Sequence, residues 1–149
     1  MGHRQVVIVL LALCGTLALT GCATGADAAP TETSASAVAA TDEMTCAGFG
    51  DVLTITANAD AGLRDGRMEE QEQQGWYRLA TRVLDRVPVR EEGAVSDAMV
   101  ELKDAAPAIA IGVIETPGIG SAEWDSANQA LGDACADVGG PSIEMFTGG

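Results

Sequence analysis

Hydrophobic and polar positions repeat with helical spacing in four parts of the chain. Apolar residues that recur every three or four positions lie on one face of an α-helix. Such faces run through residues 46–63, 76–87, 95–102 and 124–138. The pattern therefore predicts four amphipathic helices and an all-α fold.

Residues that favour helix ends border these segments. Glutamates at 69, 70 and 72 suit the N-terminus of the second helix, and Pro88 stops it. Ser121 is a candidate N-cap for the fourth helix, and the Gly139-Gly140 pair marks its end. The predicted connections are short, and four helices joined in this way form an antiparallel, up-down bundle.

Two apolar segments have no helical repeat. Residues 105–120 read AAPAIAIGVIETPGIG, and proline and glycine interrupt the apolar run. This composition fits either a short helix or an extended strap across the bundle. The C-terminal segment 141–149 carries Ile143, Met145 and Phe146, which we expect to dock on the domain.

The N-terminus has the pattern of an export signal. Arg4 precedes an apolar run of about 14 residues, whereas a membrane-spanning helix needs roughly 20. The run ends in Leu19-Thr20-Gly21-Cys22, which resembles the lipobox of bacterial lipoprotein precursors. The resemblance covers only these first 22 residues. It implies that signal peptidase II removes residues 1–21 and that a diacylglyceryl group attaches to Cys22, holding the chain on the outer face of the cell membrane.

Residues 22–43 differ in composition from the rest of the chain. They are mostly Ala, Thr, Ser and Asp, and Val38 is their largest aliphatic residue. Such a segment buries too little apolar surface to offset chain entropy. We therefore expect a disordered linker over 22–43 and one domain over 44–149.

The cysteines divide according to position. Cys14 lies in the signal, and the lipobox assigns Cys22 to the lipid. Cys46 and Cys135 remain, and thiols outside the cytosol usually pair in small domains. In an up-down bundle the start of the first helix and the end of the fourth lie at the same end. The sequence therefore predicts a small four-helix bundle closed by one Cys46–Cys135 disulfide.

Charge and composition exclude several functions. The chain has a net charge of −14, from 8 basic and 22 acidic residues, and loss of the signal with Arg4 leaves −15. A chain this acidic does not favour binding to nucleic acid or to anionic membrane lipids. Contact with the membrane should therefore come only from the lipid attached at Cys22. The only histidine, His3, lies in the signal, which excludes Ser-His-Asp catalysis and histidine metal sites from the mature chain. We expect no enzyme activity, metal or cofactor.

One candidate ligand pocket lies at the end of the predicted bundle opposite the disulfide. Trp76 and Trp124 begin the second and fourth helices, and helical projection places Asp60 on the inward stripe of the first helix. These three residues could line a pocket. The alternative is that both tryptophans fill the core and that Asp60 pairs with a neighbour such as Arg64.

A candidate patch for an anion or a partner follows the second helix. Arg78, Arg82 and Arg86 recur every four residues. They could bind an anionic group or a protein, or they could form a solvated face paired with acids such as Asp85.

These features predict a membrane-anchored lipoprotein of the bacterial cell envelope. Its expected role is that of a non-catalytic accessory or interaction module, with an envelope protein as partner. The alternative is a small-ligand-binding lipoprotein that uses the Trp76/Trp124 end.

Overall fold

The chain folds into four helices in the part that the structure, a computed structural model, describes. It describes the backbone of residues 32–146 and side chains from residue 37 onward. The helices are α1 (Glu32–Arg64), α2 (Glu70–Arg86), α3 (Ala94–Ala105) and α4 (Ala122–Cys135), followed by the short 3₁₀ helix η1 (Ala136–Val138). The all-α prediction is confirmed. The predicted signal and Cys22 lie outside the described residues.

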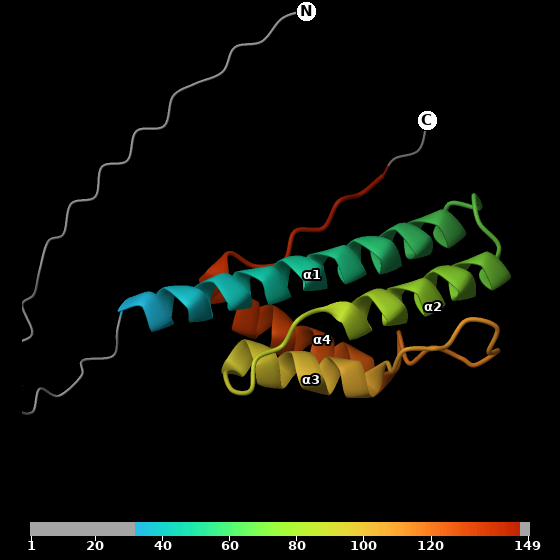
Figure 1. The fold of residues 1–149 in the computed structure, drawn as a ribbon. Helices are drawn as coiled ribbons and strands as arrows, with labels where there is room; N and C mark the ends of the chain where they lie inside the picture. The colour runs from blue at the N-terminus through green and yellow to red at the C-terminus, as the bar shows by residue number, and fades with distance from the viewer. Residues whose placement is uncertain (1–31, 147–149) are drawn as a thin grey trace, which may run out of the picture.

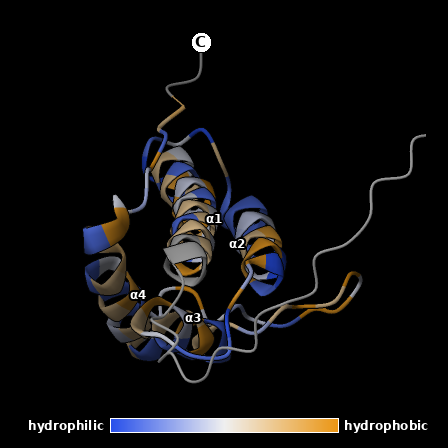
Figure 2. Cartoon of the chain, turned by 60° about the vertical axis from the view of Figure 1, so that its left-hand side comes forward, coloured by the Kyte–Doolittle hydropathy of each residue, from blue (hydrophilic) through white to orange (hydrophobic). Residues whose placement is uncertain are grey.

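Successive helices run in opposite directions (Figure 1). α1 packs chiefly on α2, and α3 packs chiefly on α4, so two helical hairpins face each other. Figure 2 shows the two pairs from a second direction. The loop that connects α3 to α4 is partly hydrophobic and projects from the bundle. The predicted up-down order is therefore confirmed. No helix in residues 32–146 is long and apolar enough to span a membrane.

The local sequence explains where the later helices begin and end. α2 starts with Glu70 and Glu72 and finishes with Arg86, charges that complement its dipole. The Ser121 hydroxyl accepts a hydrogen bond from the Trp124 amide, which confirms the predicted N-cap of α4.

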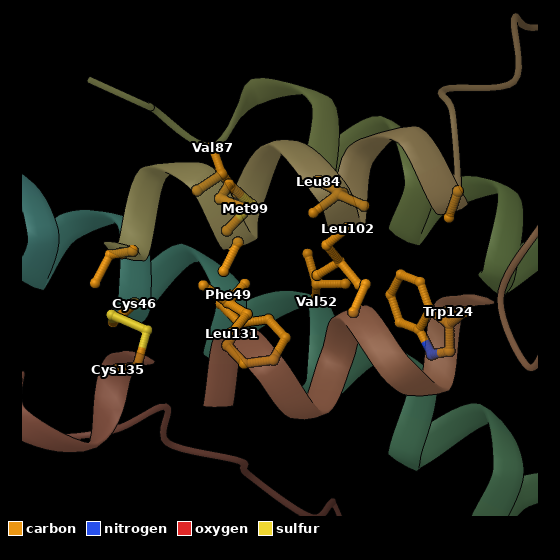
Figure 3. Packing of buried hydrophobic residues seen from close by; sticks show 14 of the residues in the cluster. Cys46, Phe49, Val52, Leu84, Val87, Met99, Leu102, Trp124, Leu131 and Cys135 are labelled. Atoms are coloured by element: carbon orange, nitrogen blue, oxygen red, sulfur yellow. A yellow bond between two sulfur atoms is a disulfide. The ribbon is translucent and has the colours of Figure 1, made fainter. Parts of the chain in front are cut away.

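All four helices contribute to one core. Large side chains that are almost completely buried interleave along its axis (Figure 3). They are Phe49 and Val52 of α1, Leu84 of α2, Met99 and Leu102 of α3, and Leu131 of α4. The Cys46–Cys135 disulfide closes one end of this core, with Cα atoms 5.7 Å apart, and Trp124 fills the opposite end (Figure 3). The predicted disulfide is confirmed.

α1 begins earlier than the expected domain boundary at residue 44. Its N-terminal part includes Asp42, whose carboxylate pairs with the Arg90 guanidinium at 3.0 Å, and Thr45, whose hydroxyl donates to the Pro88 carbonyl at 2.7 Å. Alanine-rich sequence extends an existing helix at little cost, because the packed residues beyond it have already formed the nucleus. Residues 37–43, which fall in the expected linker, therefore continue the first helix of the bundle.

Candidate functional site

The three residues of the predicted pocket lie in different surroundings. Trp124 is buried in the core, as the alternative interpretation expected. Trp76 is 41% exposed and lines a surface cavity of about 370 Å³ together with Met68 and Phe146. Neither Trp124 nor Asp60 lines that cavity. The three residues therefore do not form one pocket.

Asp60 is exposed, so the prediction that it faces inward is wrong. Its carboxylate accepts hydrogen bonds from the Gln73 amide at 2.9 Å and from the Tyr77 hydroxyl. The expected arginine partner is also absent from these contacts, because Arg64 pairs with its neighbour Asp65. Since α1 packs chiefly on α2, Asp60 meets the flank of α2 and not the bundle axis.

The contact with Asp60 affects the ionisation of Tyr77. Partial burial of the phenol raises the pKa of Tyr77 well above its ordinary value, and the hydrogen bond to the carboxylate and its negative charge raise it further. The phenol therefore stays protonated at neutral pH and acts as a hydrogen-bond donor between α2 and α1. This contact joins the flank of α2 to α1.

The arginines of α2 bind main-chain oxygens of the α3–α4 loop. The Arg78 guanidinium donates to the Glu115 carbonyl at 3.2 Å, and that of Arg82 donates to the Ile109 carbonyl at 3.5 Å. Arg86 is exposed in the last turn of α2. The predicted continuous patch is therefore divided, because two of its three cations hold the loop.

The α3–α4 loop, residues 106–121, is anchored at both ends. Ile109 is buried, and its amide donates to the Thr81 hydroxyl at 3.3 Å. On the return side Pro117 is buried, and Gly118 lies so close to the Ala105 carbonyl that a Cβ would clash with it. The loop is thus neither a helix nor a strap across the bundle. Its two ends are fixed and its tip projects (Figures 1 and 2).

The tip of this loop exposes large apolar side chains. The Val113 amide donates to the Ala110 carbonyl and closes a turn, in which Gly112 has a φ of +85°. Ile111 and Ile114 are 89% and 90% exposed. We call residues 110–114 the apolar tip. Isolated exposed aliphatic residues are common, but here two isoleucines almost wholly in solvent lie on one anchored turn and form an exposed apolar surface.

The apolar tip was not identified from the sequence. The sequence pattern that indicates such a tip is present in residues 105–120, where two prolines and several glycines interrupt an apolar run. These residues prevent a continuous helix, so the isoleucines cannot all turn toward the core. The tip lies at the end of the bundle where Trp124 begins α4, opposite the disulfide (Figures 1 and 3).

The C-terminal segment 141–146 docks along α1 through its main chain. The Thr54 hydroxyl accepts the Glu144 amide at 3.0 Å. The Asn58 side chain donates to the Glu144 carbonyl at 2.6 Å and accepts the Phe146 amide at 2.7 Å. The expected docking side chains stay half or more exposed, at 50% for Ile143 and Met145 and 64% for Phe146.

Within residues 32–146, no group of three or more His, Cys, Asp or Glu side chains could hold a metal ion. Comparisons with family models, curated proteins and solved structures find no match to this chain.

Proposed function

We propose that this protein is a lipoprotein of the bacterial cell envelope, held in the membrane through Cys22, and that its domain is a non-catalytic interaction module. The lipobox at Leu19–Cys22 supports the anchor. The apolar tip supports the interaction role, and its partner is an envelope protein with a complementary apolar surface.

The exposure of Ile111 and Ile114 is the observation that carries the interaction role. Burying one such side chain contributes about 1.5 to 3 kcal/mol, so the pair could supply a large part of the energy of a small interface. The anchored loop helps further, because a preformed turn loses less conformational entropy on binding than a flexible one.

The arrangement of the helices supports a partner away from the lipid. α1 has 33 residues and is therefore about 50 Å long. The proposed anchor precedes its N-terminal end, while the apolar tip lies at the other end of the bundle (Figure 1). In this arrangement the tip is directed away from the anchor, and the acidic surface disfavours contact with anionic headgroups.

Two experiments test the two parts of the proposal. Replacement Cys22→Ala should move the protein from the membrane fraction to the soluble envelope fraction, and retention in the membrane would refute the anchor. Ile111→Asp with Ile114→Asp should abolish a cross-linked adduct formed in intact cells, whereas the matched exposed change Val100→Asp on α3 should not. Equal adducts in all three proteins would refute the role of the tip. A reproducible extra mass of a few hundred daltons in native mass spectrometry would instead favour the small-ligand alternative.

A further inference from the structure

We propose that α1 and the start of α2 form a binding site for an extended polypeptide segment of a partner protein, and that the chain's own residues 141–146 occupy this site in the unbound protein. The site consists of Gly50, Thr54 and Asn58 on α1 and the adjoining cavity beside Trp76. It shares no residue with the apolar tip.

The repeat of the helix matches the repeat of an extended chain. Gly50, Thr54 and Asn58 are four residues apart, and they meet Ser142, Glu144 and Phe146, which are two residues apart. Four residues of helix rise about 6.0 Å, and two residues of an extended strand advance about 6.6 Å. Successive turns of α1 can therefore contact every second residue of any extended segment.

The hydrogen bonds recognise the main chain of the bound segment and not its side chains. Thr54 and Asn58 bind amide and carbonyl groups that every non-proline residue has. Gly50 has no Cβ, and a Cβ built there would lie 2.6 Å from the Ser142 carbonyl oxygen, so glycine is what permits this close approach. An extended segment of a different sequence could make the same hydrogen bonds.

The chain's own tail leaves the apolar part of the site incompletely used. The cavity of about 370 Å³ is lined mainly by apolar groups, including Ile55, Met68 and Trp76. Phe146 lies at this cavity but stays 64% exposed, and Trp76 stays 41% exposed. A partner segment that places a large apolar side chain deeper in the cavity would bury more surface than the tail and could replace it.

The connection to α4 allows the tail to leave. Gly139 and Gly140 have φ values of +105° and +68° and join η1 to the tail. Glycine adopts such conformations without the strain of other residues. The tail can therefore rotate away without disturbing the disulfide at Cys135. As a tethered ligand at an effective concentration of the order of millimolar, it would exclude weakly binding segments.

The test uses the synthetic peptide PSIEMFTGG, the sequence of residues 141–149, and the purified full chain with and without those residues. We expect saturable binding to the shortened chain, detected by Trp76 fluorescence, and much weaker binding to the intact chain. Asn58→Ala removes two of the three hydrogen bonds and should weaken binding at least about tenfold. A peptide with alanine in place of the phenylalanine should also bind less tightly, and one with tryptophan there should bind more tightly.

Controls separate binding from folding. Trp76→Phe should remove the fluorescence response, because Trp76 lines the cavity, so calorimetry measures binding to that variant. If a shortened chain with an intact disulfide does not bind the peptide, or binds it equally with Asn58→Ala, the proposal is refuted. If the shortened chain does not fold, hydrogen exchange decides the question in the full chain. Asn58→Ala should then speed exchange at the Glu144 and Phe146 amides when compared with Asn128→Ala, and equal rates would refute the site.

Discussion

The Cys46–Cys135 disulfide should supply a large share of the stability of the bundle. It links α1 to the end of α4 across a sequence separation of 89 residues. In the chain-entropy description, closing a loop of this length stabilises the folded state by about 4 to 5 kcal/mol. A domain of this size has a free energy of unfolding of only about 5 to 15 kcal/mol. Loss of the bond should therefore remove about a quarter or more of that free energy.

The corresponding change in melting temperature follows from the size of the domain. Unfolding of about 115 residues changes the entropy by about 0.24 kcal/mol/K, so a loss of about 4 to 5 kcal/mol lowers the Tm by about 17 to 21 °C. Circular dichroism should show this drop both for Cys46→Ala with Cys135→Ala and for protein refolded in the presence of reductant.

Comparison of these two samples separates the cross-link from packing. Both sulfur atoms are buried, so the double alanine variant also loses core contacts, whereas the reduced protein retains them. The reduced protein should therefore melt slightly above the double variant and far below the oxidised protein. If the reduced and oxidised proteins melt within about 5 °C of each other, the reasoning from loop closure is wrong.

Three further predictions concern contacts in the helices and loops. Tyr77 is the only tyrosine, so an alkaline absorbance titration should place its pKa above the ordinary value of about 10. The unfolded chain loses the phenol proton at a lower pH than the folded chain does. The stabilisation of the folded state that comes from this proton should therefore be complete below about pH 10 and decline above it. Asp60→Asn should lower the midpoint of the Tyr77 titration, and an unchanged midpoint would contradict the contact. Gly118→Ala should destabilise by about 1 to 3 kcal/mol in urea unfolding because of the clash with Ala105, whereas Gly132→Ala, at an open helical position, should stabilise by about 0.5 to 1 kcal/mol. Asp42→Ala should cost about 1 to 3 kcal/mol because it leaves the Arg90 guanidinium unpaired, and an unchanged urea midpoint would show that the start of α1 does not contribute to the domain.

The helices and the disulfide could be predicted because they depend on side-chain periodicity. Phe49, Leu84 and Leu131 belong to apolar repeats, and the up-down order places Cys46 beside Cys135. The start of α1 has no such repeat. Residues 37–43 are mostly small and exposed, and they are helical because they continue a segment that packing already holds.

The candidate sites were harder to predict because they depend on tertiary packing and on main-chain groups. Helical projection placed Asp60 inward, since it assumes a core centred among four equivalent helices. Arg78 and Arg82 bind carbonyl oxygens, and Asn58 binds the tail main chain. A hydropathy pattern reports which side chains avoid water and contains no information about which main-chain groups need partners.

The central claim is that the apolar tip is an interaction surface, and photo-cross-linking from within the tip tests it most directly. A photoreactive amino acid replaces Ile114 in one protein and Val100, 45% exposed on α3, in another. Illumination of intact cells should give one discrete protein adduct from position 114 that position 100 does not give, and Ile111→Asp should abolish it. No adduct from position 114, or the same adducts from both positions, would contradict the claim.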